Sequence, residues 1–115
     1  MKKYITLIGL IIFSANALCA PPIKQGQRFV VARKLLVNYH WKPLRKHSHE
    51  NYEYGGLERI LYERGFKELE FCTVDTSQCV FYYVKKKACI RLDTMGEKVD
   101  EMIVVQWSNE CPDSK

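Results

Sequence analysis

Four cysteines in the second half of the chain, Cys72, Cys79, Cys89 and Cys111, are the residues whose type most clearly allows chemistry. The first two close a short polar loop, CTVDTSQC, which contains one acidic residue. Such a pair can be half of a metal site, a redox-active pair or a disulfide across a turn. Zinc sites usually bring cysteines in close Cys-x-x-Cys pairs, and neither pair here has that spacing. The choice then depends on whether the chain lies in an oxidising compartment.

The histidines form the one metal-like cluster in the sequence. His47 and His49 flank Ser48, Glu50 follows, and His40 lies a few residues before them. Imidazoles beside a carboxylate can bind zinc or copper, but this motif lies in a polar stretch with no evident scaffold. We therefore expect no metal site and no cofactor, and a solvated segment that titrates near neutral pH.

No catalytic constellation is evident in the sequence. Ser48 lies between two histidines, but residues adjacent in sequence rarely form a triad, and no Gly-x-Ser-x-Gly elbow exists. Paired carboxylates occur at Asp100–Glu101 and at Glu68 and Glu70. We expect the first pair to begin a strand and the second to point outward from one, so that solvation explains both. The sequence predicts no enzyme.

The first twenty residues indicate export. They begin with two lysines, continue as an apolar run to Phe13 and end in small and polar residues at Ala20. This is the layout of a secretory signal peptide, and its apolar run is too short to span a bilayer. We expect residues 1–20 to be a signal peptide cleaved after Ala20, and residues 21–115 to form one small domain.

Two alternatives to a cleaved, unanchored chain are a buried N-terminal helix and a lipid anchor at Cys19. Lipoprotein processing needs a small residue directly before the modified cysteine, and Leu18 stands there. No later segment is apolar enough to cross a membrane. We favour a soluble exported protein, periplasmic or secreted.

The charge of residues 21–115 gives little reason to expect a nucleic-acid partner. Loss of Lys2 and Lys3 leaves 16 basic residues against 13 acidic ones, a net charge of +3. The one tight basic run, Lys85 to Lys87, is typical of a solvated turn. A nucleic-acid interface needs a broader basic stripe.

Export decides the question of the cysteines, because four cysteines in an oxidising compartment indicate disulfides. We predict that Cys72 pairs with Cys79 across a hairpin. The remaining pair, Cys89 and Cys111, would then draw the C-terminal tail back over the sheet.

The first half of the chain has helical periodicity. Apolar residues recur at helical spacing in RFVVARKLLVNY, and Pro43 ends this helix. A second helix is predicted over Tyr54 to Arg64. Gly65 stands where a left-handed cap is needed, and Phe66 can reach back to Leu61 in a Schellman ending.

The second half has the alternation of strands. The segments are LEFC, CVFYYV, ACIRLD and EMIVVQW, with connections short enough for antiparallel pairing. The predicted fold is α+β, with two N-terminal helices packed on one face of a four-stranded antiparallel meander and two disulfides.

The chain resembles a group of small, exported, uncharacterised Gram-negative bacterial proteins. The segments that carry the resemblance run from Arg33 to Trp107: RKLL, HWKP, GFKELEFC, CVFYYV and RLDTMGEKVDEMIVVQW. The shared features are the two cysteines that bracket a loop, a Thr-x-Gly-Glu turn at residues 94–97, and Trp107. The resemblance implies export and a small α+β fold but no activity. The layout is also similar to one repeat of the β-lactamase inhibitor protein, which is an analogy of fold alone.

Alternation along the strands predicts which side chains meet the helices. The residues expected to face the helices are Leu69, Phe71, Val80, Tyr82, Val84, Ile90 and Leu92. The residues expected on the opposite face are Cys72, Cys79, Phe81, Tyr83, Cys89, Arg91 and Asp93.

Aromatic and apolar residues supply the candidate binding surface, because Tyr, Trp, Phe and Met are enriched at protein interfaces. Phe81, Tyr83, Met102 and Val104 are expected to share the sheet face away from the helices. Trp41, Tyr52 and Tyr54 are expected around the connection between the helices. The alternative is that the C-terminal tail covers the sheet and that Trp41 fills the core.

The sequence therefore predicts a non-enzymatic exported module that binds another protein. An inhibitor or immunity protein against a secreted toxin or hydrolase fits the size and the disulfides. The alternative is an envelope assembly or maintenance accessory protein. A small secreted enzyme or effector is the third hypothesis.

Overall fold

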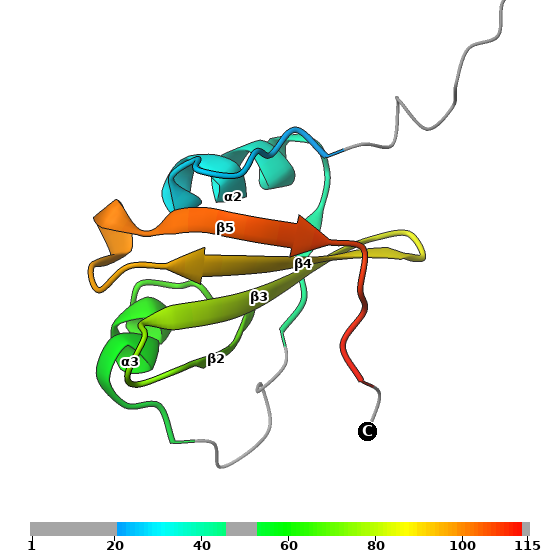
Figure 1. Cartoon of the computed structure of the whole chain (residues 1–115). Helices are drawn as coiled ribbons and strands as arrows, with labels where there is room; N and C mark the ends of the chain where they lie inside the picture. The colour runs from blue at the N-terminus through cyan, green and yellow to red at the C-terminus, as the bar shows by residue number, and fades with distance from the viewer. Residues whose placement is uncertain (1–20, 46–52, 114–115) are drawn as a thin grey trace, which may run out of the picture.

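A computed structural model describes residues 21–45 and 53–113, in which two helices lie on one face of an antiparallel sheet (Figure 1). The helices are α2 (Phe29–Asn38) and α3 (Gly56–Glu63), and a short 3-10 helix, η1, spans Val99–Glu101. The strands are β1 (Lys42–Pro43), β2 (Leu69–Cys72), β3 (Gln78–Lys85), β4 (Ala88–Met95) and β5 (Ile103–Ser108). The predicted α+β class is confirmed.

The predicted arrangement is wrong both in the order of the elements and in the number of strands. The helices are not both N-terminal, because β1 lies between them, and the sheet has five strands rather than four. β1 is only two residues long, so it has no periodicity that a sequence could display. Lys42 pairs with Val84 and Pro43 with Tyr83, at the edge of β3 that β2 occupies further along. An edge position suits Pro43, which has no N–H for a second neighbour.

Helix α2 fully buries three of the five residues predicted to share one face, which are Phe29, Ala32, Leu35, Leu36 and Tyr39. Phe29, Ala32 and Leu36 are fully buried, whereas Tyr39, which shares their spacing, lies past the helix end and is 53% exposed. The chain then turns at His40, whose φ is 72°.

Helix α3 ends in the predicted Schellman motif. Phe66 N–H donates to Leu61 O and Gly65 N–H donates to Tyr62 O, both at 3.0 Å. Gly65 has a φ of 97°, a conformation that glycine adopts without the cost of a Cβ.

The core lies between the helices and the sheet. Side chains from both helices, from β2 to β5 and from the turn before β5 meet there. The main ones are Phe29, Leu36, Leu61, Leu69, Phe81, Tyr83, Ile90, Leu92, Met102 and Val104. Phe29 stacks on Phe81 with ring centroids 4.3 Å apart. Gly96 allows the turn after β4 to close, since a Cβ there would lie 2.8 Å from the Met102 Cα.

A bulge in β2 reverses the predicted faces of β3. Leu69 pairs with Phe81, but Phe71 pairs with Val80, so one extra residue separates them. Leu69 is therefore buried in the core while Phe71 is 41% exposed on the other side. Phe81 faces the helices with Leu69, so the assignment of Val80 to the core face is wrong.

The same shift corrects the other predicted faces. Cys72 and Cys79 are paired on the helix side of the sheet. Phe81 and Tyr83 also face the helices, so the predicted outward orientation of these four residues is wrong. Ile90 and Leu92 are in the core as predicted. A second bulge, at Val105 in β5, brings both Val104 and Trp107 to the helix side, although they are three positions apart and regular alternation would place them on opposite faces.

We expect Phe81→Ala to lower the free energy of unfolding by about 3–5 kcal/mol, because it leaves a cavity under Phe29 in the core. Phe71→Ala, on the exposed side of the neighbouring strand, should change it by only about 0.5 kcal/mol. Urea melts of the two variants measure the difference. Equal losses would show that the faces of the strands are assigned incorrectly.

Candidate functional site

The predicted aromatic interface does not form one surface. Phe81, Tyr83, Met102 and Val104 are fully buried in the core, so their predicted outward orientation is wrong. The bulges in β2 and β5 are the physical reason, since each shifts the alternation by one residue. Glycine often marks a bulge in a strand, but the two bulged positions carry Glu70 and Val105. The sequence therefore carries no signal for these bulges.

The residues predicted around the helix connection are dispersed. Trp41 is 5% exposed and belongs to the core cluster, as the alternative interpretation proposed. Tyr54 is half-buried and stacks on Tyr62 with centroids 4.1 Å apart. Tyr52 lies outside the described residues.

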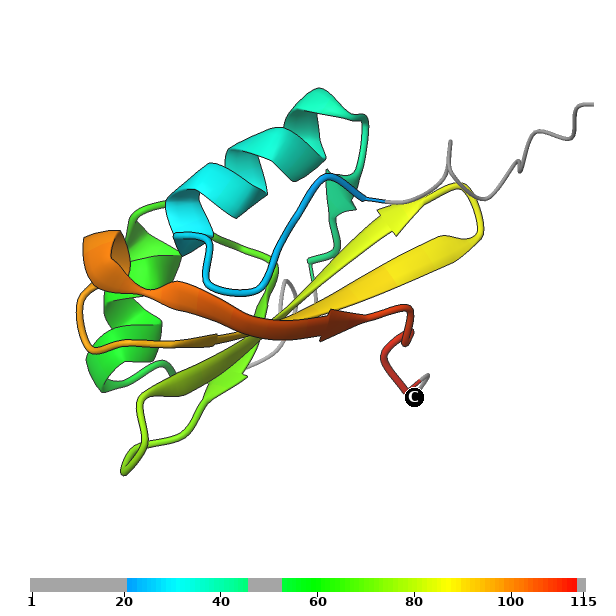
Figure 2. The ribbon, with the colours of Figure 1, turned by 45° about the horizontal axis from the view of Figure 1, so that its top comes forward.

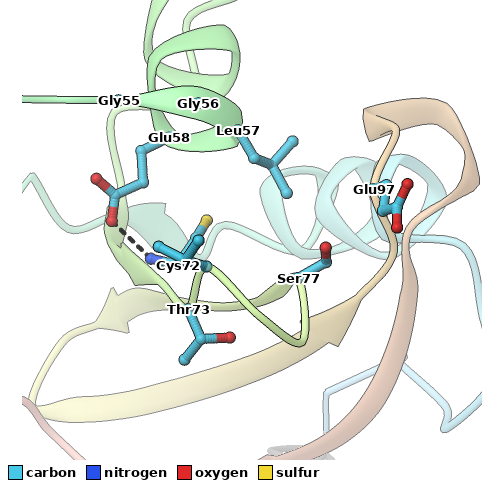
Figure 3. A pocket seen from close by; sticks show the side chains of 9 residues that line it. Gly55, Gly56, Leu57, Glu58, Cys72, Thr73, Ser77 and Glu97 are labelled. Atoms are coloured by element: carbon cyan, nitrogen blue, oxygen red, sulfur yellow. Dashed lines mark hydrogen bonds between the residues drawn. The ribbon is translucent and has the colours of Figure 1, made fainter.

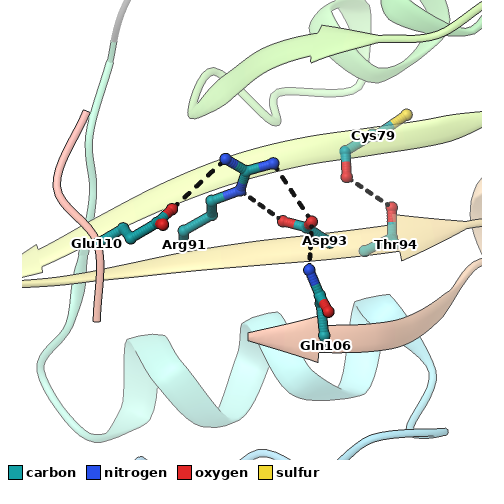
Figure 4. Close-up of polar contacts among 6 residues, drawn as sticks. All are labelled: Cys79, Arg91, Asp93, Thr94, Gln106 and Glu110. Carbon is teal, nitrogen blue, oxygen red and sulfur yellow. Dashed lines mark hydrogen bonds and ion pairs between the residues drawn. The ribbon is translucent and has the colours of Figure 1, made fainter. Parts of the chain in front are cut away.

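Both predicted disulfides are present. Cys72 is bonded to Cys79, and Cys89 to Cys111. The second bond holds the C-terminal tail against the outer face, which we define as the sheet face opposite the helices. Asn109 donates to Cys89 O at 3.3 Å, and Glu110 lies 3.5 Å from Arg91 (Figure 4).

Polar groups occupy the centre of the outer face. Arg91 donates twice to the Asp93 carboxylate, at 2.8 and 3.3 Å, and Gln106 donates to the same carboxylate at 3.1 Å (Figure 4). The hydrogen bonding of Arg91 to the Asp93 carboxylate is the main reason that the pKa of Arg91 is raised. These side chains satisfy one another, so this cluster has a structural explanation.

The disulfide loop, residues 73–77 between Cys72 and Cys79, presents one apolar side chain to solvent. Val74 at its tip is 97% exposed, far more than any other exposed large apolar residue in the described part of the chain. The signal for this loop in the sequence was the pair of cysteines around a single apolar residue.

Hydrogen bonds hold the disulfide loop in one shape. Thr73 N–H donates to Gln78 O at 2.7 Å, and Gln78 N–H donates to Thr73 Oγ1 at 3.1 Å. The hydroxyls of Thr73 and Thr76 lie 2.6 Å apart. Gly96 N–H also donates to Ser77 O at 3.1 Å, which joins the loop to the turn between β4 and β5.

A pocket of about 400 Å³ adjoins this loop (Figure 3). The start of α3 forms one wall and the disulfide loop another; the lining side chains include Leu57, Glu58, Thr73, Val74, Ser77 and Glu97. Glu58 accepts a hydrogen bond from Cys72 N–H at 2.7 Å, which ties α3 to the edge of β2. The pocket lining is more apolar than polar, and it widens the surface around Val74.

A buried ionic cluster connects α2 to the sheet. Glu68 is fully buried and accepts hydrogen bonds from Tyr83 Oη at 2.6 Å and from Arg33 Nη2 at 3.2 Å. Arg33 Nε also donates to Glu68, and its guanidinium lies 4.8 Å from the centroid of the Phe66 ring. The predicted outward orientation of Glu68 is therefore wrong, since it lies one residue before the strand begins.

The cluster raises the pKa values of Tyr83 and Arg33. Burial raises the pKa of Tyr83 well above 10, and the charge of Glu68 raises it further. Burial lowers the pKa of Arg33, but the hydrogen bond and charge of Glu68 outweigh it, so that the net shift is upward. Neutral Tyr83 and the Arg33–Glu68 ion pair are thus the stable forms, and the cluster fits a structural role.

The described residues contain no group of three His, Cys, Asp or Glu side chains placed to hold a metal ion. The predicted cluster of His47, His49 and Glu50, together with Ser48, lies outside residues 21–45 and 53–113. His40 is exposed at the end of α2. The absence of a metal site or cofactor in the whole protein stays a prediction.

Comparison of the chain with protein-family models, with curated proteins and with solved structures found no match. In the described part of the chain, neither helix has the length and apolar character that crossing a bilayer requires. The resemblances drawn from sequence motifs therefore stay hypotheses, and any function has to be argued from the site itself.

We expect Glu68→Ala to lower the free energy of unfolding by about 3 kcal/mol, because it leaves the Arg33 charge and the Tyr83 hydroxyl without their buried partner. Asp100→Ala breaks an exposed ion pair with Arg64 and should cost less than about 1 kcal/mol. Chemical denaturation compares the two. A similar small loss in both variants would contradict the assignment of a buried ion pair.

The raised pKa of Tyr83 predicts a loss of stability at alkaline pH. The folded protein holds this proton more tightly than the unfolded chain, so the free energy of unfolding should fall as pH rises above 10, the ordinary value. Tyr83→Phe removes the titrating hydroxyl and should flatten that fall. Urea melts across alkaline pH test this. An unchanged slope in the variant would contradict it.

Proposed function

We propose that this protein is an exported protein-binding module and that the disulfide loop is its contact with the partner. The observation that carries the proposal is Val74, a 97% exposed apolar side chain at the tip of a loop closed by a disulfide. Among exported proteins that bind in this way, an inhibitor of a secreted toxin or hydrolase fits the small stapled domain best.

Rigidity of the loop supports this function. A binding loop loses conformational entropy when it docks, and a loop that is already ordered loses less. The Cys72–Cys79 bond, the Thr73 and Thr76 hydroxyls and the contact to Gly96 all restrict this loop before any partner arrives. The domain therefore offers Val74 in a fixed position.

The surroundings of Val74 extend the surface beyond one side chain. A single exposed apolar residue is common on protein surfaces and would mean little alone. Here the adjoining pocket adds Leu57 and the start of α3, so a partner can enclose Val74 and fill the pocket at the same time. Such packing would remove Val74 from water at the centre of the contact, where most of the energy of an interface is concentrated.

Site-specific crosslinking tests the proposed contact. A photoreactive residue replaces Val74 in one variant and Val37, which is 43% exposed on α2, in the control. The exported fraction of the producing cells should give a discrete crosslinked protein from position 74 and none of the same mass from position 37. The same product from both positions would contradict the assignment of the loop.

Affinity for the purified crosslinked partner gives the quantitative prediction. Val74→Asp should weaken binding by about 2 kcal/mol or more, because it places a charge in the desolvated centre of the interface. Val37→Asp should leave binding unchanged. Thermal melts of the two variants should agree, since both positions are exposed. If Val74→Asp binds the partner as tightly as the parent protein does, the proposed function is wrong.

A further inference from the structure

The charges of the protein are divided between two parts of the chain. Residues 21–45, which contain α2, carry six Lys and Arg and no Asp or Glu. Residues 53–113 carry eight basic and twelve acidic residues. The net charge is therefore +6 in the first part and −4 in the second. A separation of this size within one small domain indicates an anionic partner for the basic part.

The cations of residues 21–45 are available to a partner. Arg33 is engaged by the buried Glu68, but the other five are exposed; they are Lys24, Arg28, Lys34, Lys42 and Arg45. η1, which packs beside α2, carries Asp100 and Glu101, and Asp100 is paired with Arg64. The excess of positive charge on the α2 side thus persists after the ion pairs are counted.

Exposed cations and apolar residues alternate along α2 and the residue before it. Arg28 is the N-cap, and Val31, Lys34 and Val37 follow at intervals of three residues, so each lies beside the next while the row winds around the helix. Val31, Lys34 and Val37 lie within about 120° of one another on the solvent side. Val31 is 44% exposed and Val37 is 43% exposed. We call these four residues the basic stripe. Tyr39, 53% exposed, lies just past its end.

We infer that the basic stripe docks the protein on the surface of an anionic phospholipid bilayer. Lys and Arg near such a surface are attracted to its negative potential, and exposed apolar side chains enter the headgroup layer. In the stripe, exposed valines lie between cations, so small apolar side chains can enter the headgroup layer while the charged groups stay at its surface. A fluid headgroup layer requires no matching shape.

Docking through α2 leaves the proposed protein-binding loop accessible. Figure 2 shows α2 along the top of the domain, whereas the turn between β2 and β3, which contains Val74, lies at the lower left. In Figure 1 as well, α2 lies at the top of the domain and this turn at the lower left, beside α3. The bilayer inference does not depend on the proposed function, because it uses none of the residues of the loop.

Vesicle flotation tests the inference with protein purified from cells that express the full chain. Vesicles contain phosphatidylglycerol and phosphatidylcholine in equal parts, or phosphatidylcholine alone. We expect binding to the anionic vesicles only, and its loss at high salt. The double variant Arg28→Glu/Lys34→Glu should weaken this binding at least about tenfold.

A matched control separates the stripe from net charge. Arg59 and Lys98 are exposed cations outside residues 21–45, and Arg59→Glu/Lys98→Glu changes the net charge by the same amount. This control should retain binding. Val31→Ser/Val37→Ser should weaken binding if the valines enter the headgroup layer. Circular dichroism melts check that each variant folds like the parent.

Three outcomes would overturn the inference. One is an absence of binding to the anionic vesicles. The second is an equal loss in the two charge-reversal variants, which would make the effect one of net charge. The third is tight binding to polyglutamate with no binding to vesicles, which would identify an acidic polypeptide as the partner. Since Val74→Asp should not change vesicle binding, failure here is distinguishable from failure of the proposed function.

Discussion

The bulge in β2 is the constraint on which the arrangement of this domain depends. By inserting one residue between Leu69 and Phe71, it turns Cys72 toward the helices opposite Cys79. The disulfide then closes a hairpin whose base is in the core and whose tip projects into solvent. Without the bulge, Cys72 would stand on the same face as Phe71 does now, and the bond to Cys79 could not form on the core side.

The ionic cluster around Glu68 fixes the helix layer to this sheet. Glu68 directly precedes β2, Arg33 is on α2 and Tyr83 is on β3, so one carboxylate connects three elements. A buried charge pair of this kind contributes less to stability than its contacts suggest, because both ions lose their water. Its larger effect is to penalise any other register of α2 on the sheet, since a shifted helix would leave Glu68 buried and unpaired.

The two proposed surfaces follow from this rigid scaffold. The disulfide loop projects from one end of the sheet and carries Val74, while α2 covers one face of the sheet and leaves Lys34 exposed to solvent. A protein held at a bilayer by α2 would present the loop away from that surface. Partner binding and membrane docking can therefore be varied independently, by substitutions at residue 74 and in the basic stripe.

The sequence by itself determined the α+β class and the Schellman ending at Gly65, because these depend on local chemistry. It also determined both disulfide pairs, because Cys72 and Cys79 flank a short hairpin loop and leave Cys89 and Cys111 for each other. Tertiary structure alone decided the faces of β3 and of the bulged parts of β2 and β5. Alternation assigns faces only while every residue is paired, and the bulges at β2 and Val105 broke it. Tertiary structure also decided that Lys42–Pro43 forms a strand, because two residues are too few to show a strand periodicity. It decided the burial of Glu68 as well. That carboxylate reads as exposed until Arg33 and Tyr83, distant in sequence, are folded against it.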